Sequence, residues 1–299
     1  MTAAAADVHR APVVEESLAS KVLRFVAKSP VQLLLAFIGL LWLIPTIGLF
    51  LTSLLPAADF GTTGWWKIIS KPSLATWENY HEIFRNSSIT HSLWTTLQIA
   101  IGGTVLPILV AALAAYAFAW LEFPGRDWLF LVVIGLLVVP LQMALIPIFS
   151  LYNKVGIFDT VLSLILFHTA FGLPFAIFLL RNFFIGIPKD ILESARIDGA
   201  SEFWIFLRLI LPLGLPAIAS LAIFQFLWTW NDLLVALIFL GPGEKEVLTV
   251  AVAGLVGAQQ QGWQLITAGA FISMVVPLLV FLGLQRYFVR GLTAGAVKG

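Results

Sequence analysis

The stretch that decides the fold is ESARIDGASEFWIFLRLILPL, residues 193–213. It begins with charged and small residues and ends in an apolar run. Long apolar stretches lie on both sides of it, in a chain of 299 residues that is 60% apolar. A charged segment between such stretches is typical of a loop that joins two membrane-spanning helices.

The composition of the whole chain indicates an integral membrane protein. Only 11% of its residues are charged, against about 25% in soluble domains, and its mean hydropathy is +0.98. The absence of cysteine excludes disulfides, thiolate metal sites and a thiol nucleophile. A net charge of +1 gives no electrostatic reason to expect a nucleic acid partner.

Six apolar stretches are long enough to cross a bilayer, whose hydrocarbon core of roughly 30 Å takes about 20 helical residues. Prolines lie inside several of them. Membrane helices tolerate proline where a neighbouring helix bonds the carbonyl that the proline leaves free. We therefore predict an all-α membrane protein with six kinked transmembrane helices, at about 31–55, 93–120, 128–151, 160–181, 213–240 and 266–288.

Lys and Arg are distributed unevenly between the two sides that this topology creates. An even number of spans places both termini on one side, and 12 of the 17 Lys and Arg residues fall there, together with the 193–213 stretch. Cytoplasmic loops carry an excess of basic residues. Both termini and this stretch are therefore predicted to face the cytoplasm.

The segment from Pro188 to Gly199 has the pattern of a short helix. Pro188 suits a first-turn position, and the acids Asp190 and Glu193 favour the positive end of a helix. Gly199 suits the left-handed residue that follows the last turn.

A second short helix is predicted directly after this glycine. Ser201 suits its N-cap, Glu202 its first turn, and Pro212 marks the return to the membrane. The result is a helix–turn–helix on the cytoplasmic face, which we call the elbow (residues 188–212). One interpretation is an amphipathic hairpin on the lipid headgroups. The small residues at its centre bury little in lipid and permit close approach of another surface, which favours docking to a cytoplasmic partner.

The segment ESARIDGA (193–200), followed by an apolar run and Leu211-Pro212, resembles the E-A-A…D-G…L-P loop of ABC-importer membrane subunits. Ser194 stands where that pattern usually has alanine. Further segments are similar to maltose-type permeases of the sugar-uptake branch: AAYAFAWLEFPGRD (114–127), IPIFSLYNKVGIFDT (146–160), FQFLWTWND (224–232) and QRYFVRGLTAGAVKG (285–299).

This resemblance implies a type I ABC importer fold, with a cytoplasmic N-terminal segment at 1–30, a six-span permease domain at 31–290 and a cytoplasmic tail at 291–299. Such a permease forms half of the path for a sugar, here expected to be a di- or oligosaccharide, in the inner membrane of a bacterium. The implied partners are a second homologous permease, a cytoplasmic ATPase dimer and an extracellular or periplasmic sugar-binding protein. The residues that map onto the ATPase-coupling motif are Glu193, Ser194, Ala195, Asp198, Gly199 and Ala200.

The chain has no G-x-x-x-x-G-K-[ST] loop of the kind that holds the phosphates of a bound nucleotide. No Ser/His/Asp constellation and no metal-ligand cluster stands out in it. We therefore predict that it is not an enzyme and that it binds no cofactor or metal. ATP and Mg²⁺ are expected to belong to the partner ATPase.

Polar side chains in the fifth predicted span indicate a substrate path, because polar groups inside a span are costly and mark function. On an ideal helix these side chains share an arc, and they are Gln225, Trp228, Asn231 and Asp232. Amides, carboxylates and indoles suit sugars, which offer hydroxyls for hydrogen bonds and C–H faces for stacking. The alternative is that Asn231 and Asp232 hold helices together. His168 is alone in its span, and we expect it to pack or to bond a neighbouring helix.

Two other classes of protein are alternatives. An ion-coupled secondary transporter should carry several intramembrane carboxylates or an inverted repeat, but only Asp232 clearly lies within a predicted span. A membrane-embedded enzyme needs a paired catalytic constellation. Within the importer interpretation, the alternative cargo is glycerol-phosphate or another polyol derivative.

The charge asymmetry generates a topological prediction. In this cysteine-free chain, single cysteines at Ser70 and Gln260 should react with an impermeant thiol reagent added outside intact cells, and one at Lys298 should not. Mass tagging of the purified protein measures both reactions. Labelling at Lys298 in sealed cells would contradict the orientation.

Overall fold

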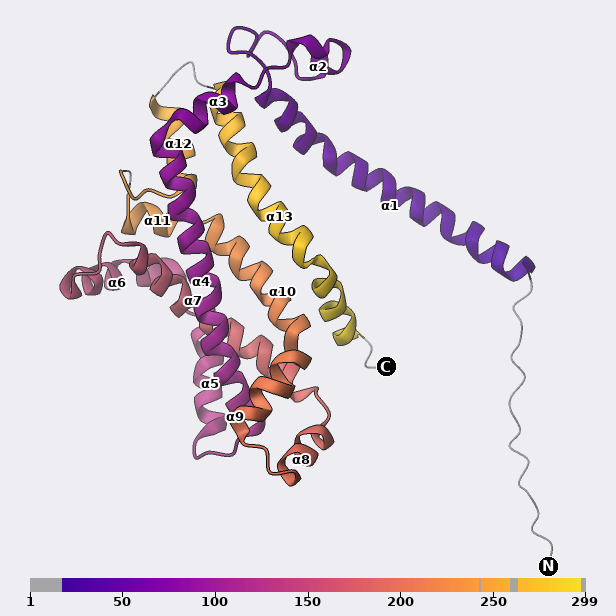
Figure 1. Ribbon diagram of the computed structural model, residues 1–299, viewed down its shortest axis with the longest axis vertical. Coiled ribbons are helices and arrows are strands. Elements are labelled where there is room, and N and C mark those ends of the chain that lie inside the picture. The colour runs from indigo at the N-terminus through magenta and orange to yellow at the C-terminus, as the bar shows by residue number, and fades with distance from the viewer. Residues whose placement is uncertain (1–17, 242, 259–262, 297–299) are drawn as a thin grey trace, which may run out of the picture. The chain divides into compact units, whose positions relative to one another are not determined.

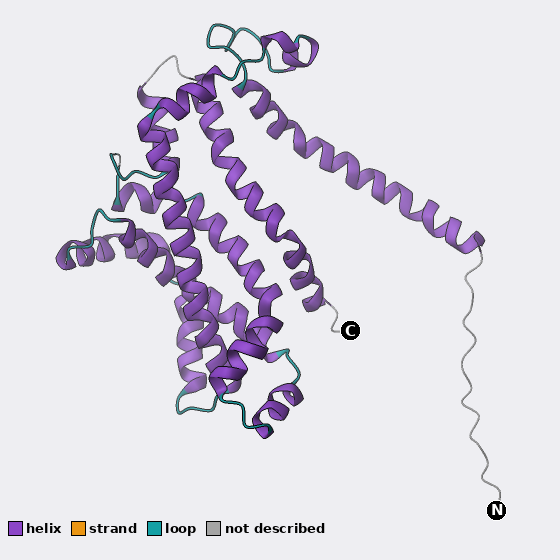
Figure 2. Ribbon diagram, in the orientation of Figure 1, coloured by secondary structure: helices purple, strands orange, loops and turns teal. Residues whose placement is uncertain are grey.

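The computed structural model describes residues 18–241, 243–258 and 263–296, and the secondary structure of these ranges is helical, without a strand (Figure 2). The chain divides into two compact units, Met1–Leu49 and Phe50–Gly299. The boundary falls within α1 (Leu18–Ser53), whose stretch Pro30–Ser53 is long and apolar enough to span a membrane. Gln260 and Lys298, used above to test the topology, lie outside the described residues.

The second unit is built from helices of very different lengths (Figure 1). Among the described residues, five helices could cross a membrane by length and composition, or six spans if the bent pair α5 and α6 is counted as one. This agrees with the all-α membrane fold predicted from the sequence. In chain order the elements are α2 (Trp66–Ser70), a 3-10 turn (Pro72–Leu74), α3 (Glu78–Arg85), α4 (Ser87–Trp120), α5 (Arg126–Leu136), α6 (Leu141–Val155), α7 (Val161–Ile185), α8 (Lys189–Ile197), α9 (Glu202–Ile205), a π-helical turn (Phe206–Ile210), α10 (Leu211–Trp230), α11 (Leu234–Phe239), α12 (Leu248–Ala258) and α13 (Trp263–Ala296).

The third predicted span, 128–151, is not one kinked helix. It consists of α5 and α6, which are bent by 100° relative to each other. Pro140 stands immediately before α6, in extended conformation. Because proline fixes its own φ and disfavours a helical residue before it, the chain breaks here instead of bending.

The fifth predicted span, 213–240, has different ends in the structure. The helix runs without interruption from Glu202 to Trp230, so Pro212 lies inside it and does not begin a new helix. The turn before this proline is π-helical, and the Leu211 N–H bonds the Phe206 carbonyl. A wider turn relieves the crowding that a proline ring imposes on the preceding turn of an α-helix. At the other end, α10 stops at Trp230, and α11 follows as a separate helix.

The C-terminal helix is longer than predicted. α13 extends to Ala296 and so includes most of the tail assigned to 291–299.

α10 lies at the centre of the second unit, where it packs against α4, α7 and α13, while α4 packs along α7. One reason for this arrangement is the proline in α4. Pro107 has no N–H, so the Gly103 carbonyl one turn earlier loses its partner within the helix. Gln225 of α10, which is 5% exposed, donates its amide Nε2 to this carbonyl at 3.0 Å and to the His168 carbonyl of α7 at 3.3 Å.

A side chain of α10 also bonds a carbonyl that a proline leaves free in α13. Pro277 leaves the Ser273 carbonyl without its helical partner. The indole Nε1 of Trp230, a side chain that is 1% exposed, donates to that carbonyl at 2.9 Å. Two prolines on different helices are therefore accommodated by side chains of α10, as expected for a bundle in lipid.

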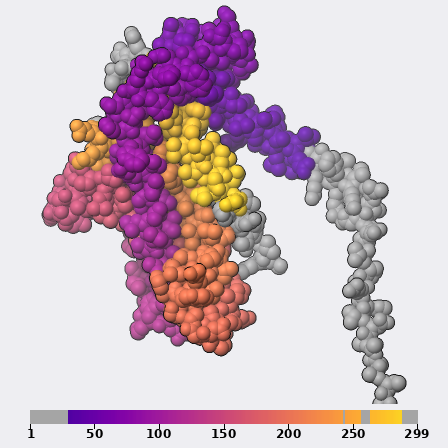
Figure 3. Space-filling model, in the orientation of Figure 1, coloured from indigo at the N-terminus to yellow at the C-terminus, as the bar shows by residue number. Residues whose placement is uncertain are grey.

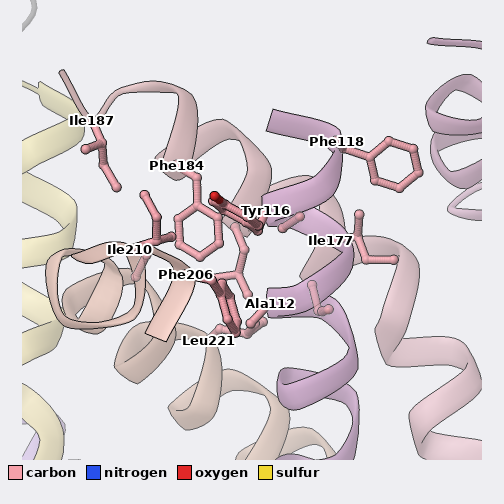
Figure 4. Close-up of a cluster of buried hydrophobic side chains, with 14 of the residues drawn as sticks. Ala112, Tyr116, Phe118, Ile177, Phe184, Ile187, Phe206, Ile210 and Leu221 are labelled. Atoms are coloured by element: carbon pink, nitrogen blue, oxygen red, sulfur yellow. The ribbon is translucent and has the colours of Figure 1, made fainter. Parts of the chain in front are cut away.

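A large apolar cluster closes the elbow end of the unit. Figure 4 shows Tyr116 of α4, Phe184 of α7 and Phe206 of the π-helical turn in this cluster, and the Tyr116 and Phe206 rings lie 5.4 Å apart. Gly214 lets α10 approach closely, since a Cβ there would lie 2.6 Å from the Phe184 ring. The elbow is thus built on a closely packed base.

The hydrogen bonds from Gln225 and Trp230 to the carbonyls that prolines leave free generate a stability prediction. Gln225→Leu and Trp230→Phe each leave a buried carbonyl without a donor, which costs about 1–3 kcal/mol. We expect both to lower the thermal unfolding temperature of the purified protein in detergent, measured by intrinsic fluorescence. The control is Asn231→Ala, because Asn231 is exposed and bonds only the Leu227 carbonyl of its own helix. Equal unfolding temperatures for all three variants would contradict the role assigned to α10.

Candidate functional site

The first helix of the elbow ends at Gly199 as predicted. Gly199 has a φ of +81°, in the left-handed region that favours glycine. The Ala200 N–H bonds the Ala195 carbonyl and the Gly199 N–H bonds the Arg196 carbonyl, both at 3.0 Å. This pair of bonds is the Schellman motif, which satisfies the last carbonyls of a helix. Pro188 differs slightly from the prediction, since it precedes α8 instead of lying in its first turn.

The second helix of the elbow begins as predicted. The Ser201 hydroxyl accepts a hydrogen bond from the Trp204 N–H at 3.3 Å, and Glu202 occupies the first turn of α9. Only three residues, Asp198, Gly199 and Ala200, separate the end of α8 from this cap. The turn is therefore short and defined by local hydrogen bonds at both of its ends.

The elbow encloses a groove of about 670 Å³. Its segment forms one end of the second unit, drawn in orange in Figure 3. Five of the six residues predicted for ATPase coupling line the groove, so the structure brings them together on one surface. The lining residues are Ile191, Ser194, Ala195, Asp198, Gly199, Ala200, Ser201, Trp204 and Leu209.

Glu193, the sixth predicted residue, does not line the groove. Its carboxylate pairs with Lys189 one turn earlier at 2.6 Å, and both side chains are largely exposed. This hydrogen bond from Lys189 lowers the pKa of Glu193. Glu193 is therefore ionised at neutral pH and presents its charge beside the groove.

A polar cluster that sequence reasoning missed holds the elbow against α4. The Arg196 guanidinium bonds both oxygens of Glu202, at 2.8 and 3.2 Å, across the Gly199 turn. The Tyr116 hydroxyl donates to the same carboxylate from α4. The opposite charges of Arg196 and Glu202 were visible in the sequence, but nothing local connected them to a tyrosine 86 residues from Glu202.

Three of the four residues predicted for a substrate path meet around His168 of α7. Gln225 bonds the His168 carbonyl, the Trp228 ring lies edge-on to the imidazole with centroids 5.2 Å apart, and Asp232 Oδ2 lies 3.7 Å from His168 Nε2. His168 is 1% exposed, and neither of its ring nitrogens has a hydrogen-bond partner among the described residues. The sequence indicated that His168 is alone in its span, but in the structure its ring has Trp228 and Asp232 as neighbours. Gln225 and His168 are buried inside the bundle, whereas the Trp228 side chain is 38% exposed and reaches the surface.

Asn231 and Asp232 follow the end of α10 and do not continue it. The Asp232 carboxylate accepts hydrogen bonds from the Val235 and Ala236 N–H groups at the start of α11, and its carbonyl accepts one from Thr249 of α12. Asn231 is exposed. The ideal helix assumed for these residues is wrong, and the contacts of Asp232 match the alternative in which it holds helices together.

Comparison with known proteins places this geometry in a family. Residues 103–294, which include the elbow and α10, match the model described as the inner membrane component of binding-protein-dependent transport systems. The chain belongs to this family. It is therefore a multi-pass membrane permease of a transport system.

Individual relatives of this permease cover most of its length. It is 51% identical over 279 residues to the osmoprotective compounds uptake permease protein GgtD of Synechocystis, covering 92% of this chain and 93% of that protein. It is 57% identical over 234 residues to the alpha-glucoside transport permease AglG of Rhizobium meliloti, covering 76% of this chain and 62% of that protein. A trehalose transport permease, SugB of Mycobacterium tuberculosis, is 37% identical over 86% of this chain and 93% of its own length.

The fold of the permease also matches a solved structure. A subunit in the crystal structure of a bacterial ABC transporter that imports alginate superposes with a TM-score of 0.72, over 92% of this chain and 99% of that one, at 21% identity. This likeness supports the ABC importer fold predicted from the sequence. Membership of the family argues against the alternatives of an ion-coupled secondary transporter and a membrane-embedded enzyme.

Proposed function

We propose that this permease is one of two homologous membrane subunits of a bacterial, ATP-driven sugar importer, and that its elbow docks a cytoplasmic ATPase subunit. The observation that carries the proposal is the groove of about 670 Å³, which gathers Ser194, Ala195, Asp198, Gly199 and Ala200 on one surface. A groove with small side chains and a backbone turn at its centre fits a protruding segment of a protein.

The apolar side chains around this groove favour a protein partner. Trp204 lines the groove and is 48% exposed, and Phe203 and Ile197 beside it are also exposed. Exposed aromatic groups next to charged residues are typical of protein interfaces. Glu193 and Asp198 contribute negative charge beside and within the groove, so a basic group on the ATPase is the complementary partner.

The proposed assignment of ATP binding to a partner subunit rests on the lack of a nucleotide-binding motif in this sequence. Without a nucleotide-binding loop in this chain, ATP and Mg²⁺ are bound by the ATPase dimer. A binding protein outside the inner membrane delivers the cargo, in keeping with the family. The excess of Lys and Arg supports an orientation with both termini and the elbow in the cytoplasm.

The cargo we propose is a neutral, hydroxyl-rich solute of the α-glucoside or small oligosaccharide class. The names of the relatives support this class, since they cite alpha-glucosides, trehalose and osmoprotective compounds. The Lys and Arg residues of the spans Ser87–Trp120, Val161–Ile185, Glu202–Trp230 and Trp263–Arg286 lie toward helix ends, at Arg181, Arg208 and Arg286. A phosphorylated polyol would require a cation along the path, so it is the less favoured cargo.

A matched pair of glycine variants tests the docking role. Gly199 and Gly125 have nearly the same φ, +81° and +78°, and at neither would an added Cβ meet an atom of this chain within 4 Å. Valine at either position costs on the order of 1–2 kcal/mol of backbone strain. Only Gly199→Val also places a side chain in the docking surface. We expect it to lose the ATPase on co-purification of the complete importer and to abolish uptake into reconstituted vesicles.

Gly125→Val, in the loop between α4 and α5, should retain the ATPase and most of the uptake. Full retention of the ATPase by Gly199→Val would exclude the elbow as the docking site. Loss of the ATPase from both variants would trace the effect to backbone strain.

A further inference from the structure

The elbow has covalent connections to two helices of the bundle and only non-covalent ones to a third. α8 follows α7 after three residues, and α9 continues through the π-helical turn into α10. α4 is distant in the chain, yet it packs along α7 and against α10 over much of its length. A displacement of the elbow therefore reaches α7 and α10 through the backbone, and it reaches α4 only through side chains.

Besides the apolar packing of Tyr116 on Phe206, hydrogen bonds that involve Arg196 and Glu202 join α4 to the elbow. Glu202 accepts hydrogen bonds from Arg196 of α8 and from Tyr116 of α4. Arg196 Nη2 also lies 3.5 Å from the carbonyl of Trp120, the last residue of α4. Since the C-terminal end of a helix dipole is negative, a guanidinium is well placed there.

The position of this cluster indicates a mechanical role. The hydrogen bond that Arg196 donates to the Glu202 carboxylate raises the pKa of Arg196, so the guanidinium is charged at physiological pH. None of its three side chains lines the groove, and Tyr116 is 5% exposed in the apolar cluster of Figure 4. The cluster thus lies outside the groove and bonds the elbow to α4.

We infer that Tyr116, Arg196 and Glu202 form a coupling clamp that transmits displacement of the docked elbow to α4. The clamp rests on the proposed docking function and adds the positioning residues through which it acts. Arg196 and Glu202 hold α8 and α9 at a fixed angle across the Gly199 turn. The Tyr116 hydroxyl then ties this rigid unit to α4, so that the three helices around Gln225 move together.

Tyr116→Phe separates transmission from docking. It removes the hydroxyl that joins α4 to the clamp and leaves the pair of Arg196 and Glu202 intact. In the complete importer, reconstituted with its binding protein and cargo, we expect normal retention of the ATPase and normal ATP hydrolysis. The cargo imported per ATP hydrolysed should fall roughly tenfold, the equivalent of one hydrogen bond to a charged group.

Tyr152→Phe is the matched control, because Tyr152 is also a buried tyrosine but lies on α6, away from the elbow. It should leave the transport ratio unchanged. If Tyr116→Phe fails to accumulate in the membrane, Glu202→Gln provides the same measurement, since a neutral amide weakens both bonds. A lowered ratio with bound ATPase supports the clamp. An unchanged ratio, or loss of the ATPase from Tyr116→Phe, overturns it.

Gly199→Val, measured in parallel, distinguishes failure of this inference from failure of the docking proposal. If Gly199→Val releases the ATPase while Tyr116→Phe transports normally, docking stands and the clamp is refuted. If Gly199→Val retains the ATPase, the elbow is not the docking site, and the clamp is refuted with it.

Discussion

The carbonyls that Pro107 and Pro277 leave free in α4 and α13 both accept hydrogen bonds from side chains of α10, and these bonds hold the bundle together. Lipid offers no hydrogen bonds, so each unpaired group costs several kcal/mol, on the order of the penalty for burying any bare polar group. α10 supplies the donors, with Gln225 directed at α4 and α7 and Trp230 directed at α13. The helix that continues from the elbow is therefore also the helix that holds the other spans together.

This arrangement gives a physical route from docking to transport. The elbow is short and fixed at both ends by hydrogen bonds, so the proposed docking of an ATPase would turn α8 and α9 as one body. The continuous helix from Glu202 to Trp230 carries that rotation into the bundle. Near its far end lies Trp228, whose partly exposed indole contacts His168 of α7. In the proposed function, this helix is the route by which movement of a docked ATPase subunit reaches the bundle.

Local sequence signals predicted local structure well. The length of the apolar stretches predicted helices that are long enough to cross a membrane, and the glycine and serine of the elbow predicted its turn, because these signals are local in the sequence. The break at Pro140 was missed, since a proline in an apolar run has the same pattern whether the helix bends or ends. The end of α10 was missed for a similar reason, because Asn231 and Asp232 look like a polar stripe until α11 is seen to begin after them. The partners of Gln225, Glu202 and His168 come from distant helices, and a single sequence does not specify these pairings.

The most direct test of the central claim is a cross-link between the elbow and the ATPase. In this cysteine-free chain, Ser194→Cys places a single thiol in the groove, where a short photoreactive reagent can be attached in membranes that contain the complete importer. Ser70→Cys, on the opposite side of the membrane in the proposed topology, is the control. The account predicts a covalent adduct of the permease with the ATPase subunit from Ser194→Cys and none from Ser70→Cys. Adducts of Ser194→Cys with lipid alone, while the ATPase remains bound to the complex, would contradict it.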